Sequence, residues 1–162
     1  MKQTFFLLMI VAASYSLTAQ DFSGTWIQQS KEHISGPEYG NAIQNQMTVA
    51  QNKDSVIITT VSAGANGQNV NNRMAMAMNG KPTIIIGKAS KRKFTSNVVL
   101  SADKKGMTIT TVYSMPDNEN ETDFTRVETW TLSADGKQLN IDKKSMETRS
   151  ETWEVKAVFV KQ

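Results

Sequence analysis

The sequence predicts an all-β protein, an antiparallel up-and-down meander that closes into a barrel of roughly 8–10 strands. Apolar and β-branched residues alternate with polar ones along most of the chain, which is the period of a strand with one buried face. Turn residues interrupt this alternation at short intervals, and no window carries the apolar stripe of a helix. Because such a sheet exposes unpaired backbone groups at its edges unless it closes, we expect a barrel. A two-sheet sandwich without a cavity is the competing architecture.

Turn chemistry separates ten expected strands. Asn79-Gly80 is a strong hairpin signal, because both residue types adopt the positive φ that a tight turn requires. Asp103 and Asp135 are each followed closely by a glycine in two similar turns, and Asn52 begins a third. Between the turns we expect strands near residues 24–31, 45–51, 54–62, 71–78, 82–87, 92–101, 106–114, 123–133, 137–143 and 150–160.

The first 19 residues predict a secretory signal peptide, with a lysine at position 2, an apolar block and a cleavage site after Ala19. Ser14 and Ser16 interrupt the apolar block before it reaches the roughly 20 residues of a membrane span, so we expect no membrane anchor after cleavage. Residues 20–162 are then a single domain, exported to the periplasm or to the exterior. The chain has no cysteine, so its stability must come from packing rather than from disulfides.

Charge gives no indication of a nucleic-acid partner. The formal net charge is +3, and loss of the signal peptide would also remove Lys2. The densest basic cluster lies where a turn enters a strand, and we interpret it as a solvated hairpin end; it consists of Lys88, Lys91, Arg92 and Lys93.

Catalysis is not expected either. One histidine and no cysteine do not supply the usual pairs of nucleophile and base. No glycine-rich phosphate loop, zinc helix or calcium loop occurs in the sequence, so we expect no cofactor and no dedicated metal site. Glu119 and Glu121 lie in a polar loop and are interpreted as a solvated hairpin tip rather than as a glycosidase pair.

The start of the mature domain reads Phe22-Ser23-Gly24-Thr25-Trp26. Its Gly24-Thr25-Trp26 segment resembles the Gly-x-Trp motif of the calycin group, which contains the lipocalins and the fatty-acid-binding proteins. Glycine permits the sharp entry into the first strand, and the indole closes one end of the barrel. Thr122-Asp123-Phe124 is similar to the Thr-Asp-Tyr element before a late lipocalin strand. The layout resembles exported bacterial lipocalin-like proteins, which implies a lipocalin-like β-barrel with a ligand cavity.

Three departures from this resemblance concern the ligand site. Only about a dozen residues, from His33 to Gln44, separate the first two strands, which is too short for the two lid helices of the fatty-acid-binding proteins. The Arg-x-Tyr element that binds a carboxylate in those proteins has no equivalent, since Arg149 is followed by Ser150 and Glu151. The disulfide and the helix of the lipocalins are also missing. The resemblance therefore transfers a fold and a cavity but no functional residue.

Strand parity places charges inside the barrel. Phe124, Trp130 and Leu132 share one face of their strand, so their burial turns Arg126 and Glu128 inward as well. On the last strand, Trp153 and Phe159 carry Glu151 the same way. A buried charge needs a partner, and we expect Arg126 to meet Glu128, Glu151 or a ligand carboxylate. Of these, the favoured interpretation is an internal ion pair that fixes the register of the strands, and a contact with a ligand carboxylate is the second.

Thioether side chains are a second group of candidates for the lining of a ligand pocket. Met74, Met76 and Met78 alternate with alanine on one strand and therefore share a face, to which Met107 and Tyr113 of a later strand could add. Flexible thioethers suit an adaptable apolar pocket, although the same residues serve equally as core filler. Because thioethers are soft ligands, Cu(I) binding by the three methionines, with help from His33, is a lower-ranked hypothesis.

The favoured function is a non-enzymatic binding module that holds a small apolar or amphipathic ligand, with Arg126 orienting any acidic group. Its expected ligand-binding residues are Met74, Met76, Met78, Met107, Tyr113, Arg126, Glu128 and Trp130. The alternative is a barrel filled by its own side chains that acts as a structural or protein-interaction domain of the cell envelope. Cavity volume separates the two, since a ligand pocket usually measures at least about 300 Å³.

Overall fold

The structure is a computed structural model, which describes residues 21–63, 69–87, 91–103 and 105–162. The predicted signal peptide lies outside the described residues. Ten strands form one antiparallel sheet in the order β4-β3-β2-β1-β10-β9-β8-β7-β6-β5. Their bounds are β1 Gly24–Ser35, β2 Gln46–Gln51, β3 Ser55–Ala63, β4 Asn69–Ala77, β5 Thr83–Ile86, β6 Lys93–Leu100, β7 Gly106–Ser114, β8 Thr122–Leu132, β9 Gln138–Glu147 and β10 Trp153–Lys161.

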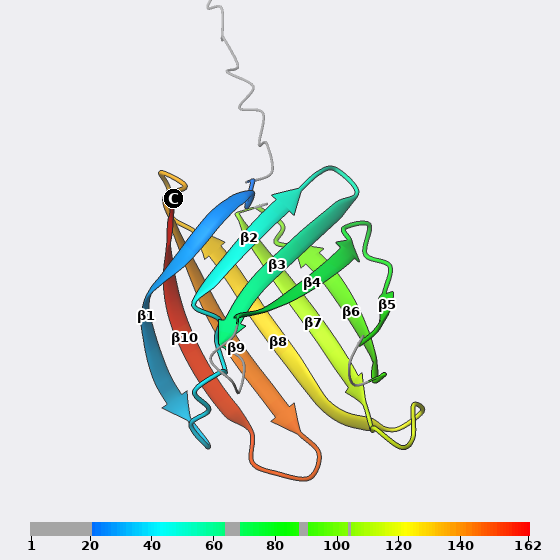
Figure 1. Ribbon diagram of the computed structural model, residues 1–162. Helices are drawn as coiled ribbons and strands as arrows, with labels where there is room; N and C mark the ends of the chain where they lie inside the picture. Colours follow the sequence, from blue (N-terminus) through cyan, green and yellow to red (C-terminus); the bar gives the residue numbers. More distant parts are fainter. Residues whose placement is uncertain (1–20, 64–68, 88–90, 104) are drawn as a thin grey trace, which may run out of the picture.

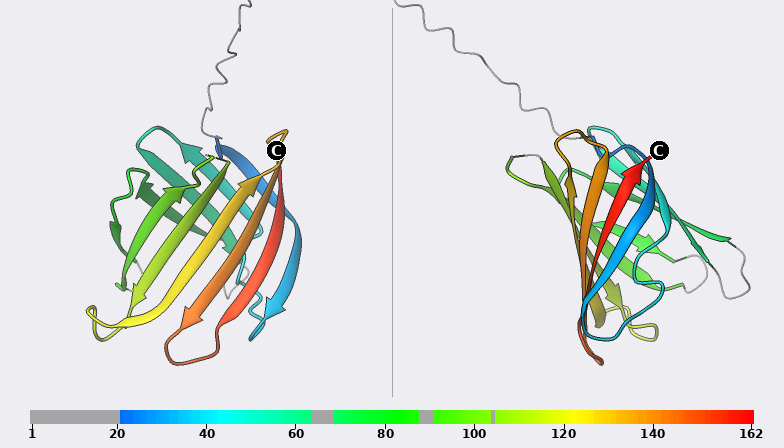
Figure 2. Two further views of the ribbon diagram at one scale, coloured as in Figure 1. Left: turned by 180° about the vertical axis from the view of Figure 1, so that it is seen from behind. Right: turned by 90° about the vertical axis from the view of Figure 1, so that its left-hand side faces the viewer.

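The sheet curls into a nearly closed barrel (Figures 1 and 2). The first and last strands pair along their length, from Trp26 opposite Lys161 to Ser35 opposite Glu154. The ends of the sheet are β4 and β5, and β4 also lies against β6. The predicted all-β meander is confirmed, with ten strands at the predicted places, and a single curled sheet replaces the alternative of a sandwich.

Two strands extend further than the sequence predicts. β1 continues to Ser35 because β10 supplies ladder partners up to that point, across two register shifts. β9 continues to Glu147 because β8 and β10 pair with it on both sides. In both strands the additional residues are mostly polar, so burial of apolar side chains does not mark them in the sequence.

Trp26 lies near the start of β1, which begins at the upper end of the barrel as drawn in Figure 1, and the Trp26 side chain is fully buried. Its indole Nε1 donates a hydrogen bond to the carbonyl oxygen of Phe22 at 2.9 Å, and the Lys161 ammonium lies 5.4 Å from the ring centroid. Phe22 is also fully buried and meets the Trp130 ring edge-on. The segment from Phe22 to Trp26 therefore closes this end of the barrel.

The connection from β1 to β2, residues 36–45, contains no helix in the structure. It begins at Gly36, whose φ of +75° lies in the left-handed region. A Cβ atom at Gly36 would collide with the carbonyl oxygen of Thr152 and lie 2.8 Å from the Cα of Trp153. Gly36 thus lets the connection pass directly against the start of β10, where a side chain has no room.

Replacing Gly36 by alanine is expected to lower the free energy of unfolding by at least about 1–3 kcal/mol, from the strained φ and the backbone collision. Denaturant unfolding followed by circular dichroism measures this loss. Gly40 is the matched control, because a Cβ there meets no atom within 4 Å and its φ is not positive. A Gly36→Ala variant as stable as Gly40→Ala would contradict the close approach to β10.

Candidate functional site

The side chains that face the interior of the barrel are apolar toward one end and polar toward the other. The upper part is filled by apolar side chains that are less than 2% exposed: Trp26, Trp130, Phe22, Phe159, Met47, Met76, Met107, Leu139, Ile141, Val56 and Val98. Toward the lower end the inward positions become polar, and the cross-strand row of Arg126 contains Thr111 and Ser145. Among the described residues that face the interior, a candidate site for a ligand therefore lies toward the lower end.

Glu128 lies at the border between the two parts, and its partner is Lys143. The Lys143 Nζ is 3.0 Å from Glu128 Oε1, and the Trp130 Nε1 donates a hydrogen bond to Glu128 Oε2 at 3.1 Å. Burial by itself would raise the pKa of Glu128, but the attraction of Lys143 and these hydrogen bonds outweigh it and hold the pKa below its usual value. An internal ion pair thus exists, with Lys143 in the place expected for Arg126.

The register explains this correction. Glu128 stands directly opposite Lys143 on β9, whereas Arg126 stands opposite Ser145. Glu151 is exposed and precedes β10, so it does not share the interior. Within the described residues, Arg126 forms no ion pair, and its buried Nε has no hydrogen-bond partner.

Aromatic rings surround the guanidinium of Arg126. Its central carbon lies 4.6 Å from the ring centroid of Phe124, 5.1 Å from that of Tyr113 and 5.7 Å from that of Trp153. Burial is the main cause that raises the pKa of the Tyr113 hydroxyl, while the charge of Arg126 acts in the opposite direction. The closest groups around the Arg126 guanidinium are therefore aromatic rings, while the charge of Glu128 acts on it without an ion-pair contact.

Arg92, which directly precedes β6, lies over two of the same rings, those of Tyr113 and Phe124. It forms an ion pair with Asp123, donates from Nε to the Ser114 carbonyl oxygen at 2.6 Å, and lies 4.8 Å from the Phe124 centroid. Its side chain is only 19% exposed, so the interpretation of Arg92 as part of a solvated hairpin end is wrong. Arg92 has a nearby carboxylate as its partner, which distinguishes it from Arg126.

A pocket of about 250 Å³ opens at this end, and we call it the mouth pocket. It is lined by Tyr39, Asn41, Ala42, Phe124, Arg126, Glu147 and Trp153. The first three belong to the connection between β1 and β2, which therefore forms one wall of the pocket. The volume lies slightly below the range of about 300–1,000 Å³ that is usual for drug-sized ligands, so a ligand here would be small.

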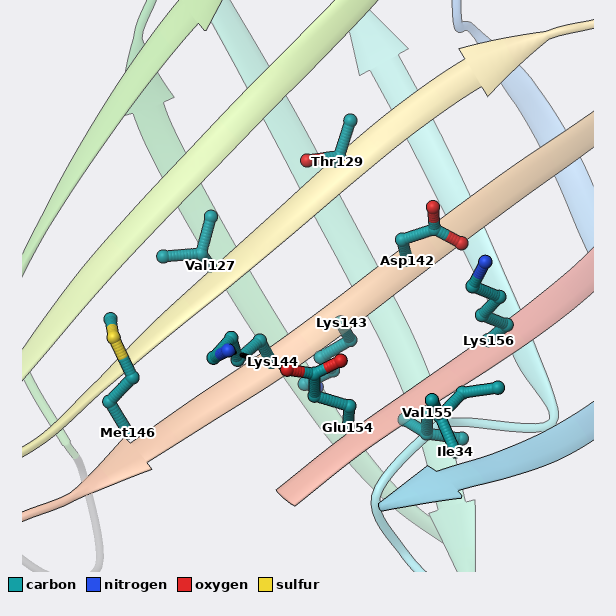
Figure 3. Close-up of a pocket in the computed structure, with 10 residues that line it drawn as sticks. All are labelled: Ile34, Val127, Thr129, Asp142, Lys143, Lys144, Met146, Glu154, Val155 and Lys156. Atoms are coloured by element: carbon teal, nitrogen blue, oxygen red, sulfur yellow. Dashed lines mark hydrogen bonds and ion pairs between the residues drawn. The ribbon is translucent and has the colours of Figure 1, made fainter. Parts of the chain in front are cut away.

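A second hollow, the outer groove, lies on the outside of the barrel across β8, β9 and β10 (Figure 3). It measures about 270 Å³ and contains the exposed side chains of Ile34 and Met146. The ion pair of Lys144 with Glu154, 2.5 Å between Nζ and Oε1, crosses its floor. Val127 and Thr129, which line it, alternate with the inward Arg126 and Glu128, so this groove is not continuous with the mouth pocket.

The structure divides the predicted ligand-binding residues between two regions. Arg126 lines the mouth pocket, Tyr113 lies against Arg126, and Glu128 is one row deeper. The others belong to the filled part: Met76, Met107 and Trp130 are buried in it, and Met74 and Met78 pack against it. This packing favours core filler as the role of the methionine face, and Cu(I) binding stays a prediction.

Sequence reasoning missed Tyr39, Glu147 and Trp153 as pocket residues. Trp153 was assigned inward, but only the folded connection brings Tyr39 to it, with ring centroids 5.7 Å apart. Glu147 lies beyond the predicted end of its strand. The inward alternation of Leu139 and Ile141, continued through β9, is the signal that could have found Glu147.

The fold is a nearly closed antiparallel β-barrel with ten strands in up-and-down order. Among solved structures, it is similar to the zebrafish ileal bile acid-binding protein, whose structure is a complex with cholic acid. The TM-score is 0.50 at 18% identity, and the match covers 87% of this chain and 98% of that chain. No family model matches the sequence, and no curated protein matches it. No helix in the described part of the chain is long and apolar enough to cross a membrane.

Proposed function

We propose that the protein is an exported, non-enzymatic binding protein that holds a small amphipathic acid in the mouth pocket. The observation that carries this proposal is the inward-facing Arg126, whose Nε has no partner among the described residues. The charge of Arg126 attracts Glu128, but the ion-pair partner of Glu128 is Lys143. Arg126 therefore has no carboxylate in ion-pair contact among the described residues, and burying such a group is costly unless an acid meets it. The calycin-type fold supports the proposal only in that such a barrel can enclose a ligand, and it does not indicate which ligand.

Arg126 is well suited to a carboxylate. A guanidinium presents its donors in a planar fork that matches the two oxygens of a carboxylate, and the bond is strengthened by charge. The rings of Phe124 and Trp153 beside it provide apolar contact for the rest of the ligand. Met74, Met76 and Met78 belong to the filled part of the barrel or pack against it, so they support the fold rather than contact the ligand.

Replacing Arg126 by methionine is expected to weaken the binding of 3-phenylpropionate by at least about tenfold, because one charge-assisted contact is worth about 1.5–3 kcal/mol. Isothermal titration calorimetry of wild type and variant measures the change. The neutral 3-phenylpropanamide should bind both proteins equally weakly. The free energy of unfolding should change by less than about 1–2 kcal/mol, since the lost contacts with rings are modest and no partner charge is left alone.

Arg73→Met is the matched control, because Arg73 is exposed on β4 and paired in register with Thr59, away from the pocket. It removes the same charge and should leave the affinity for 3-phenylpropionate at the wild-type value. If Arg126→Met and Arg73→Met bind the acid equally well, Arg126 does not orient an acidic ligand.

The alternative function is a filled barrel that acts through its surface. The tight packing around Trp26 and Trp130 favours it, and so do three exposed apolar side chains on β5 and β6: Ile84 (64% exposed), Ile86 (54%) and Val99 (52%). Native mass spectrometry of protein purified from its own host separates the two functions. A retained small molecule supports binding, whereas a bare chain that also fails to bind 3-phenylpropionate supports the filled barrel. The same spectrum tests export, since cleavage after Ala19 would give a chain that begins at Gln20.

A further inference from the structure

The mouth pocket contains one cation and one anion that are not paired with each other. Arg126 and Glu147 both line it, and no ion pair joins them in the described part of the chain. They are diagonal neighbours on β8 and β9, since Glu147 stands opposite Phe124 and Arg126 opposite Ser145. Long side chains at diagonal positions can reach each other. The contacts that each of these two side chains makes with other residues must therefore keep them apart.

Glu147 is held by two donors on the same oxygen. The Ser145 hydroxyl donates to Glu147 Oε1 at 2.6 Å, and the Trp153 Nε1 donates to the same atom at 3.1 Å. Its Oε2 has no hydrogen-bond partner within the residues that the structure describes. The carboxylate is therefore fixed away from Arg126 and retains one oxygen that can accept a hydrogen bond from a ligand.

Arg126 is held in a corresponding way. The rings of Phe124, Tyr113 and Trp153 hold its guanidinium in place, and the Tyr113 hydroxyl also interacts with it. The buried Nε still has no hydrogen-bond partner in the described residues. The pocket thus has a fixed donor group and a fixed acceptor group of opposite charge. A ligand with only a carboxylate would satisfy Arg126 but would bring its negative charge close to Glu147.

The other walls are aromatic, and the space is small. The rings of Tyr39 and Trp153 meet edge to face at 62°, and the electron-rich face of such rings attracts an ammonium group. The volume of about 250 Å³ lies below the range of about 300–1,000 Å³ that is usual for drug-sized ligands. This size excludes a long-chain lipid from lying wholly inside the mouth pocket.

From this arrangement we propose that the mouth pocket binds a small zwitterion, with its carboxylate on Arg126, its ammonium on Glu147, and its apolar group against Trp153 and Tyr39. The inference rests on the proposed binding function and names the ligand class. Free amino acids with an apolar side chain, and the termini of very short peptides, carry this combination of charges.

The test uses three probes that share one phenyl ring: phenylalanine, 3-phenylpropionate without the ammonium, and phenethylamine without the carboxylate. Calorimetric titration at pH 7 is expected to give phenylalanine a Kd at least about tenfold lower than either truncated probe, since each charge contact adds at least about 1.4 kcal/mol. The Glu147→Gln variant should reduce phenylalanine to the affinity of 3-phenylpropionate. Its amide oxygen can still accept from Ser145 and Trp153, so the pocket keeps its shape.

Glu154→Gln is the matched control, because Glu154 lies on the outer groove and pairs with Lys144. It should leave all three affinities unchanged. If 3-phenylpropionate binds as tightly as phenylalanine in an Arg126-dependent manner, the zwitterion inference is overturned while the proposed binding of an acid stands. If none of the three probes binds, both proposals fail.

Discussion

Replacing Trp26 by alanine is expected to lower the free energy of unfolding by about 3–5 kcal/mol, the usual cost of emptying a buried tryptophan site. Trp26 is fully buried, and Lys161 covers the outer face of its ring. The variant leaves a large void at the closed end and also removes the hydrogen bond to Phe22. Denaturant unfolding followed by far-ultraviolet circular dichroism measures the loss, since the variant retains two other tryptophans that complicate fluorescence.

Trp26→Phe separates packing from hydrogen bonding. It keeps an aromatic ring in place but leaves the Phe22 carbonyl without its donor, so a smaller loss of about 1–3 kcal/mol is expected. Ile84→Ala is the surface control, because Ile84 is 64% exposed and its truncation should change stability by less than about 0.5 kcal/mol. Equal effects of Trp26→Ala and Ile84→Ala would show that the ring does not close the barrel.

Replacing Lys143 by methionine is expected to cost about 3–5 kcal/mol at pH 7, because it leaves the Glu128 carboxylate buried without its partner. Methionine fills a similar volume, so the loss reports charge rather than packing. The double variant Glu128→Gln/Lys143→Met removes both charges and should recover most of the lost stability. A double variant no more stable than Lys143→Met would mean that the pair has no electrostatic coupling.

The free energy of unfolding is expected to depend on pH differently in wild type and in Lys143→Met. In wild type the pKa of Glu128 is held below its usual value of 4.5, so its contribution is present above that pH and is lost as the pH falls through the lowered pKa. In Lys143→Met, burial is opposed only by the Trp130 hydrogen bond and the charge of Arg126, so the pKa of Glu128 should be higher than in wild type and less stability should be lost as the pH falls. The difference in unfolding free energy between the two proteins is therefore expected to narrow between pH 7 and pH 4.

Alternating patterns predicted the barrel, and the resemblance of its first strand to the Gly-x-Trp motif implied the closed end. Gly24-Thr25-Trp26 indicated where the first strand begins, and the parity of Phe124, Trp130 and Leu132 placed Arg126 inside. Both inferences use only positions along one strand, and local sequence encodes these well.

The partners of these residues depend on register between strands, which local sequence does not determine. Glu128 pairs with Lys143 because the hairpin from β8 to β9 places them opposite each other. Lys143 and Glu147 lie where the inward side of β9 becomes polar, so the apolar alternation that marks a strand disappears there. Tyr39 comes from a connection without any periodicity, and only the folded chain brings it to Trp153.

The connection between β1 and β2 lines the mouth pocket, whereas other segments fill the closed end, and this separation has an evolutionary consequence. Gly36 fixes the start of this segment against the backbone of β10, while Tyr39, Asn41 and Ala42 form a wall of the mouth pocket. The residues that fill the closed end do not line this wall. Substitutions at Tyr39 and Asn41 can therefore alter the lining of the mouth pocket without changing the side chains that fill the closed end.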